Sequence, residues 1–226
     1  MAPTGSCTGP EEIERVLTLL SGDSLTAAPG LLGARLSVTG PEGRVGVRLT
    51  EVEAYRGRTD PGSHAFGGRT ARNATMFEAA GAVYVYFTYG MHHCVNLVTG
   101  PAGQAAAVLL RGGQIVEGID LARRRRPAAS VDRDLARGPA RLCAALGLTR
   151  ADDGLRLGPD DSRLSLSLPE TPVAEDRLRF GARTGVSGPG GDGRTYPWRF
   201  WIDGEPTVSP YRAAAPRRRT RSSASQ

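Results

Sequence analysis

The strongest constraint on the fold is a segment, residues 45–55, in which apolar side chains alternate with small or polar ones. Its odd positions are apolar at first and end in Glu51, Glu53 and Tyr55. Because neighbouring side chains of a strand point to opposite faces, we expect these odd positions to share one face. A carboxylate is costly to bury unless it is paired. We therefore expect a strand that leaves the core and enters a pocket at Glu53; the alternative is an edge strand with an exposed end.

The remaining sequence divides into short elements around one long connection. Apolar residues at helical spacing predict helices over 11–21, 115–126 and 139–146. Apolar runs predict strands over 82–89, 93–98, 104–111, 178–182 and 198–202, and the apolar run at 31–38, broken by Gly33, is expected to lead into a strand. The strands on either side of residues 89–91 form a hairpin with its tip there. A connection as long as 56–81 is uncommon in a compact domain and is more often functional than filler. Residues 151–176 are expected to be mostly loops.

Length and charge suggest one domain with an acidic partner. The chain has 226 residues and a net charge of +6, and all 29 of its basic residues are arginine. We expect a flexible N-terminus at 1–10, one domain at 11–212 and a disordered basic tail at 213–226. Arginine forks suit phosphate, and nucleic acid is the commonest acidic partner of a basic protein without a membrane segment.

Several classes of protein are excluded by composition. The three cysteines are odd in number and widely spaced, which excludes a disulfide framework and a CxxC metal site. No apolar run of membrane-spanning length and no secretion signal is present, so we expect a reducing, cytoplasmic location. The chain has no lysine, so only its N-terminal amine could form a Schiff base.

The candidate residues are a carboxylate and a set of aromatic rings. Tyr55 lies two positions after Glu53, on the same face of the expected strand, where a ring could hold a base while the acid sits beside the sugar. Tyr84 and Tyr86 share a face of the first hairpin strand, and Tyr89 lies near the tip. The alternatives are that these tyrosines only pack in the core or rim, and that His64, in a glycine-rich loop, is a surface residue.

The motifs together resemble the alkyladenine, or 3-methyladenine, DNA glycosylase family. The segments EVEAYRG, SHAFGGRTARN, GAVYVYFTYGMHHCVN and AVLLRGG occur in the order and spacing of that family. The resemblance is weaker over the helix at 139–146 and over RFWIDGEPTVS. Two departures are Ala71, where family members often have proline, and residues 151–176, which have no clear counterpart. The resemblance implies a single α+β domain with a curved, mainly antiparallel sheet flanked by helices.

The resemblance also implies a role for each motif residue. Glu53 matches the general base that activates water, and Arg111 matches the arginine that helps to hold this water and a phosphate. The residues that match those sandwiching the extruded base are Tyr55, His64 and Tyr86. Asn96 matches the asparagine that crowds the exocyclic amine of guanine. The residues expected to contact DNA are the wedge Tyr89 together with Met91 and Arg69.

The implied function is a monofunctional DNA glycosylase that removes alkylated purines from double-stranded DNA. The resemblance implies no cofactor and no metal, a monomer, and a location at the bacterial nucleoid or, in a eukaryote, in the nucleus. One alternative is a nucleic-acid-binding module without catalysis. Another is a metal hydrolase using His64, His92 and His93, which is disfavoured because adjacent strand residues point to opposite faces. The lesion spectrum and the leaving-group acid stay open, and the arginines at 123–126 are interpreted as a solvated helix end.

Overall fold

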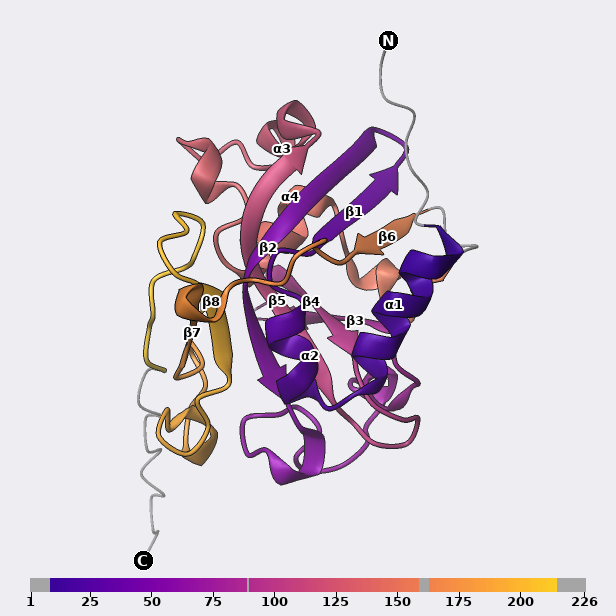
Figure 1. Cartoon of the computed structure of the whole chain (residues 1–226), viewed down its shortest axis with the longest axis vertical. Coiled ribbons are helices and arrows are strands. Elements are labelled where there is room, and N and C mark those ends of the chain that lie inside the picture. Colours follow the sequence, from indigo (N-terminus) through magenta and orange to yellow (C-terminus); the bar gives the residue numbers. More distant parts are fainter. Residues whose placement is uncertain (1–8, 89, 159–162, 215–226) are drawn as a thin grey trace, which may run out of the picture.

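The computed structural model describes residues 9–88, 90–158 and 163–214, and it is built on one antiparallel sheet. The main path of the sheet has the order β3-β4-β5-β2-β1-β6, and β8, paired with β7, pairs with Glu51–Glu53 of β2, on the edge opposite β5. The strands are β1 (Arg35–Gly40), β2 (Gly43–Tyr55), β3 (Val83–Thr88), β4 (His92–Val98), β5 (Ala107–Glu117), β6 (Leu164–Ser167), β7 (Leu178–Gly181) and β8 (Arg199–Ile202). Helices flank this sheet in Figure 1, and the predicted α+β fold class is confirmed.

The helices pack on one face of the sheet and close the main core. They are α1 (Pro10–Ser21), α2 (Ser24–Gly30), α3 (Ile119–Arg125) and α4 (Pro139–Leu146). In α1, the buried residues Ile13, Val16 and Leu20 follow the helical spacing read from the sequence. Short 3₁₀-helices lie at Gly57–Thr59, Ala74–Phe77, Asp132–Asp134, Arg150–Asp152, Glu175–Arg177 and Pro189–Gly191. Since the helices cover one face of the sheet, the opposite face is left to form a site.

A β-bulge in β2 corrects the predicted alternation of that strand. Pairing of β2 with β5 shifts register between Leu49 and Val52. Before the shift, Leu49 points into the main core, and after it the core side chains are Val52 and Ala54. The odd positions therefore do not share one face along the whole strand. The bulge turns Glu53 and Tyr55 to the sheet face that lies away from the main core, which explains the change from apolar to acidic residues.

Three further elements differ from the sequence predictions. The helix predicted over 115–126 is wrong in its first turn, because β5 continues to Glu117 and Gly118, at φ +68°, separates it from α3. The α2 helix was not predicted, since seven residues that include Pro29 give no clear period. The β6 strand lies in a region predicted to be loops, although its sequence LSLS alternates and its leucines are buried.

The long connection at 56–81 packs a second, smaller core under β3. Met76 from this connection packs with Tyr84, and Phe77 and Tyr86 lie against the same cluster. Asn73 is buried and donates hydrogen bonds to the carbonyls of His64 and Gly68, at 2.9 and 3.0 Å. These contacts hold the loop that carries His64 against the tyrosine-rich strands.

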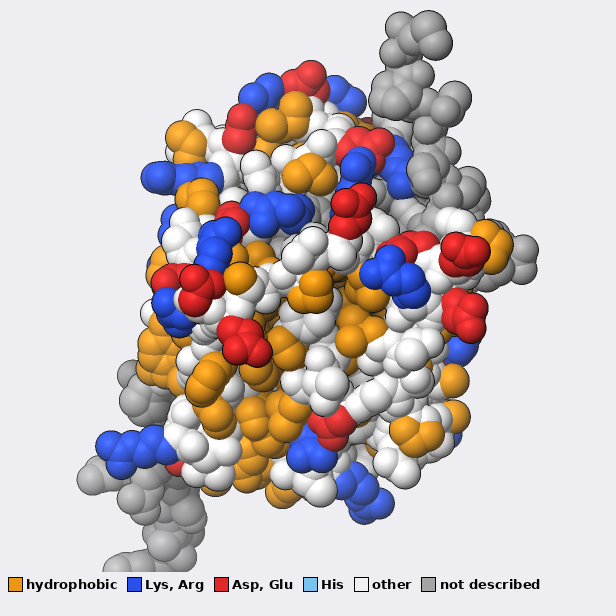
Figure 2. Space-filling model, viewed as in Figure 1, with side chains coloured by type: hydrophobic (Ala, Val, Ile, Leu, Met, Phe, Trp, Pro, Cys, Tyr) orange, Lys and Arg blue, Asp and Glu red, His pale blue; other side chains and the backbone are white. Residues whose placement is uncertain are grey.

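The surface carries mixed charge on the face drawn in Figure 2. Arginine and acidic side chains are interspersed there, with hydrophobic side chains between them, so the net positive charge does not form a single field on this face. None of the helices in the described ranges is long and apolar enough to cross a membrane. Residues 1–8 and 215–226, most of the predicted flexible ends, lie outside the described residues, and the predicted domain limits stay predictions.

Candidate active site

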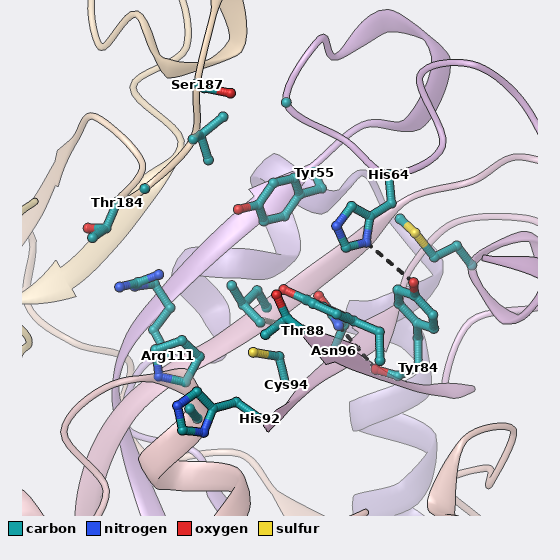
Figure 3. A pocket seen from close by; sticks show the side chains of 18 of the residues that line it. Tyr55, His64, Tyr84, Thr88, His92, Cys94, Asn96, Arg111, Thr184 and Ser187 are labelled. Atoms are coloured by element: carbon teal, nitrogen blue, oxygen red, sulfur yellow. Dashed lines mark hydrogen bonds between the residues drawn. The ribbon is translucent and has the colours of Figure 1, made fainter. Parts of the chain in front are cut away.

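A cavity of about 610 Å³ opens on the face of the sheet that the helices leave free. Its walls come from the end of β2, from β3, β4 and β5, from the connection at 56–81, from the start of α4 and from residues 184–187. In Figure 3, Arg111 and Thr184 lie at one end of the cavity, and His64 and Tyr84 lie at the other. The hydroxyl of Tyr55 points toward the arginine end.

Strand register brings distant sequence motifs into one row. Glu53 on β2 pairs with Leu109 on β5, Leu109 pairs with Asn96 on β4, and Asn96 pairs with Tyr84 on β3. Paired residues of antiparallel strands point to the same face. The row therefore places an acid, an amide and an aromatic ring on the cavity side of four neighbouring strands. The next pair, Tyr86 and Cys94, adds a second ring on the same face.

Glu53 lies just beneath the cavity surface. Its side chain is 0% exposed. One oxygen accepts a hydrogen bond from the Tyr55 hydroxyl at 2.8 Å, and the other accepts one from the Thr184 backbone N–H at 2.7 Å. Arg111 Nη1 lies 3.4 Å from that second oxygen. All three neighbours are donors or cations, which suits an ionised carboxylate that can only accept.

Tyr55 is kept protonated and therefore remains a donor to Glu53. Burial, followed by the negative charge of Glu53, raises the pKa of the Tyr55 phenol well above its usual value, although Arg183 acts in the opposite direction. A neutral phenol can donate its proton to the carboxylate. Tyr55 and Glu53 were predicted to share one face of the strand, and the 2.8 Å hydrogen bond between them confirms this.

Arg111 is held by a second acid, Glu51, which lies away from the cavity. Its Nε donates to Glu51 at 2.9 Å and its Nη2 donates to the Ser209 hydroxyl at 3.3 Å, which leaves Nη1 toward Glu53. Burial lowers the pKa of Arg111, but Glu53 and Glu51 outweigh this effect and raise it. The guanidinium therefore stays charged, and its orientation is fixed by the neighbours on two sides.

His64 and two tyrosines form the aromatic end of the cavity. The rings of His64 and Tyr86 meet edge to face with centroids 4.6 Å apart, and His64 Nδ1 lies 3.3 Å from the Tyr84 hydroxyl. Burial, followed by the positive charge of Arg72, lowers the pKa of His64, so the imidazole is neutral near pH 7. Burial raises the pKa of Tyr84 to about 12. The aromatic end is therefore uncharged at neutral pH.

Comparison with known proteins decides the family of this chain. A family model described as methylpurine-DNA glycosylase matches residues 18–206. A protein of Streptomyces avermitilis is 60% identical over 196 residues, which is 86% of this chain and 90% of that protein. The chain belongs to the methylpurine-DNA glycosylase family. Relatives from Leifsonia xyli subsp. xyli and Nocardia farcinica are 55% and 48% identical, and each match covers 84% of this chain and 88% of the relative. All three relatives carry the name "Putative 3-methyladenine DNA glycosylase".

Membership of the methylpurine-DNA glycosylase family confirms the enzyme class predicted from the motifs. The protein is a DNA glycosylase, a hydrolase of N-glycosyl bonds that acts on DNA in repair. The site residues carried over from the resemblance are not tested by this membership. Their roles therefore stay predictions, to be judged by the geometry of the cavity.

The residues predicted to exclude guanine or to contact DNA differ in their position relative to the cavity. Asn96 lines it, is 4% exposed and donates to the Tyr84 carbonyl at 3.0 Å. Met91 is 68% exposed beyond the hairpin strands. Arg69 is exposed, and its guanidinium lies 5.9 Å from the centre of the Phe77 ring. Tyr89, the predicted wedge, lies outside the described residues.

The other polar groups near the site do not support the alternative chemistries. His92 lines the cavity, whereas the His93 ring packs against Phe87 with centroids 5.1 Å apart. Within residues 9–88, 90–158 and 163–214, no three potential metal-binding side chains cluster. Burial raises the pKa of the Cys94 and Cys143 thiols, so both stay protonated rather than nucleophilic.

The run of arginines at the end of α3 is partly paired. Arg123 forms ion pairs with Asp120 and Asp132, both at 2.8 Å. Arg125 contacts Glu42 at 3.2 Å. These pairs fit the interpretation of a solvated helix end better than a surface of free cations.

Sequence reasoning missed four residues that organise the site. Glu51 was noted only as a second acid on the strand, although it orients Arg111. Thr184 gives a backbone N–H to Glu53, and no side-chain motif could reveal that contact. Arg183 and Asp60 form a fully buried pair beside Tyr55. Glu51, Asp60 and Arg183 are charged residues that can be seen in the sequence, but Asp60 and Arg183 pair across 123 positions, which no local pattern reveals.

Proposed function

We propose that this protein removes alkylated purines, such as 3-methyladenine and 7-methylguanine, from double-stranded DNA by hydrolysing the N-glycosidic bond. The observation that carries this proposal is a paired, buried carboxylate, Glu53, at one end of a cavity whose other end is aromatic. A base within a duplex is out of reach of such a cavity, so the nucleotide must rotate out of the helix. The protein acts as a monomer in this proposal.

The aromatic side chains select the damaged base. Alkylation at N3 or N7 leaves a purine with a positive charge, and Tyr55, Tyr86 and the neutral His64 offer electron-rich faces to it. Each such cation–π contact contributes about 0.5–2 kcal/mol, the higher values applying where water is excluded. An undamaged neutral base gains less, and the buried Asn96 crowds the amine of guanine. Tyr89, the predicted wedge, fills the place that the extruded base leaves in the stack.

The acid end of the cavity carries out the hydrolysis. Water enters between Glu53 and Arg111, whose 3.4 Å contact is the longest of the three made by the carboxylate. Glu53 accepts a proton from the water as the water oxygen bonds to C1′ of the sugar, and the bond from C1′ to the purine breaks. The electron pair of that bond neutralises the positive charge of the alkylated base. The products are the free base and an abasic site.

The strand stays intact, because cleavage through a covalent imine needs an amine. The chain contains no lysine, and its N-terminal amine is the single primary amine available. Borohydride added during the reaction should trap almost no protein on DNA. A substantial yield of trapped adduct would refute a monofunctional enzyme.

The decisive experiment compares the wild type with Glu53→Gln on duplex DNA that contains one 7-methylguanine. Glutamine preserves the size of the side chain and removes its basicity, so single-turnover base release should fall by about 10²–10⁴-fold. Binding to the damaged duplex should change by less than about threefold. Circular dichroism and thermal melting control for folding.

Three outcomes would contradict this proposal. Equal base release by both proteins would remove Glu53 from catalysis, and damaged-DNA binding without release in the wild type would favour a binding module. Loss of wild-type activity in excess chelator would favour a metal hydrolase; we expect full activity.

A further inference from the structure

A buried arginine covers one face of the Tyr55 ring. The Arg183 guanidinium lies 4.5 Å from the centre of that ring and 5.2 Å from the centre of the Trp198 ring. Arg183 is 1% exposed and does not line the cavity, whereas Tyr55 does. The guanidinium therefore lies behind the ring, and the opposite face of Tyr55 is the one available to a base.

The charge of Arg183 is balanced by one carboxylate. Asp60 accepts a hydrogen bond from each terminal nitrogen of Arg183, both at 2.6 Å, and both side chains are 0% exposed. Arg183 also donates to the carbonyls of Ala54 and Gly190, at 3.0 and 2.8 Å. The arrangement is tight, since a Cβ added to Gly62 would lie 2.4 Å from an Arg183 nitrogen. Arg183 and Asp60 thus form a fixed, electrically neutral pair.

The neutrality of this pair matters for a cationic ligand. A cation behind an aromatic ring weakens the attraction of the other face for a second cation, because the two like charges repel across the ring. A base stacked on the free face of Tyr55 would lie about 8 Å from the Arg183 guanidinium, given a van der Waals separation of about 3.5 Å between stacked rings. Water does not screen this path, because both members of the pair are buried.

We propose that Asp60 is a specificity-determining residue, which cancels the charge of Arg183 so that Tyr55 can bind a positively charged base. Arg183 is the positioning residue of this unit: it fixes the Tyr55 ring from behind, and its neighbour Thr184 donates to Glu53. The inference rests on the proposed function, since it assigns the cationic alkylated purine as the ligand of Tyr55. It adds that the Asp60–Arg183 pair, which lies behind the Tyr55 ring, determines the preference for a cationic over a neutral lesion.

The test measures binding of two lesions without catalysis. The probes are duplexes with 7-methylguanine, which is cationic, or hypoxanthine, which is neutral, each on a 2′-fluoro sugar that resists hydrolysis. The readout is the ratio of the two dissociation constants within each variant. Because it is a ratio, a general loss of affinity or stability cancels.

The single variants should move this ratio in opposite directions. Asp60→Asn leaves Arg183 uncompensated, and the preference for the cationic lesion should fall about tenfold. Arg183→Gln leaves Asp60 uncompensated, and the preference should rise. The double variant is neutral again and should return to within about threefold of the wild-type ratio. Asp152→Asn is the matched control: it removes a carboxylate, 4% exposed, that pairs with Arg163 and does not line the cavity.

The outcomes separate this inference from the proposed function. An unchanged ratio in whichever single variant folds, or a double variant that keeps the altered ratio, overturns the role of the pair. If the wild type binds neither lesion more tightly than undamaged duplex, the proposed function itself fails and this inference falls with it.

Discussion

Glu51 and Glu53 are two residues apart on β2, and both are fully buried, but their surroundings differ. Glu51 accepts from Arg111, Arg199, and the backbone and hydroxyl of Ser209, all at 2.7–2.9 Å. Among the described residues, Glu53 has three partners, of which the cation is the most distant, at 3.4 Å. The Glu51 cluster is closed, whereas every partner of Glu53 lines the cavity.

This difference supports the proposal that Glu53 acts in catalysis, whereas Glu51 has a structural role. A carboxylate whose hydrogen-bonding positions are all filled by short contacts cannot exchange a partner for water without a large loss of stabilising free energy. Glu53 can do so, because its contact with Arg111 is long and lies at the cavity wall. Arg111 belongs to both environments, because it donates to Glu51 and Ser209 and also faces Glu53.

The largest effect expected from this comparison is on stability, at Glu51. Replacing Glu51 by Gln leaves the buried guanidinium of Arg199 without its anion and leaves Arg111 with the more distant Glu53 alone, and should lower the free energy of unfolding by about 3–5 kcal/mol. Glu53→Gln should lower it by much less, since Arg111 keeps Glu51. Urea unfolding of both variants measures the difference; equal losses would break the comparison.

Acid should remove from the wild type the stabilisation that ionised Glu51 provides. Burial opposes ionisation of Glu51, but Arg111, Arg199 and Ser209 outweigh it, so the pKa lies below its ordinary value of 4.5. A lowered folded-state pKa means that the stabilisation is present above pH 4.5 and is lost as pH falls through the folded value. Unfolding free energies measured across this range should fall in the wild type and stay flatter in Glu51→Gln. A parallel fall would contradict the assignment.

Arg111→Lys tests the residue that the two environments share. A lysine ammonium is a point charge that can serve one carboxylate but cannot span both. Base release should fall by about 10–10²-fold, and the free energy of unfolding by about 1–2 kcal/mol. Single-turnover kinetics and urea unfolding on one preparation would show both losses. A loss of stability alone would mean that Arg111 acts only in the closed cluster.

Substitution of Asn96 by Ala should affect the cavity and leave the Glu51 cluster unchanged. The smaller side chain makes room for the amine of guanine, and release of undamaged guanine should rise about tenfold, which is within the range of one steric contact. The lost hydrogen bond to the Tyr84 carbonyl should cost about 1 kcal/mol of stability. Mass spectrometry of bases released from undamaged DNA measures the gain. No change in guanine release would count against the steric role.

The smallest effect expected is a pH dependence from His64. Its pKa is lowered by burial and by Arg72, so it gains a proton only below its ordinary value of 6.5. Between about pH 7 and about pH 5, protonation should weaken binding of a cationic lesion by a few-fold. His64→Gln should lack this dependence, whereas Glu51→Gln should retain it. Fluorescence anisotropy with the 2′-fluoro duplex measures both.

Sequence periodicity predicted much of the fold because burial leaves a direct imprint on short segments. The helix at α1 and the paired strands β3 and β4 follow their apolar patterns. The predicted alternation of β2 was wrong beyond Leu49, because a bulge is a property of strand pairing and not of the strand alone. The α2 helix was missed because its stability comes from packing.

The sequence by itself determined the ordered motifs, the absence of lysine and the enzyme class that follows from family membership. The tertiary structure alone decided which acid is enclosed by arginines and which one borders the cavity. It also decided that Asp60 and Arg183, 123 positions apart, form a neutral pair behind Tyr55. The physical reason is that composition fixes the available charges, whereas the energy of each charge depends on distance and burial, which arise only when the chain has folded.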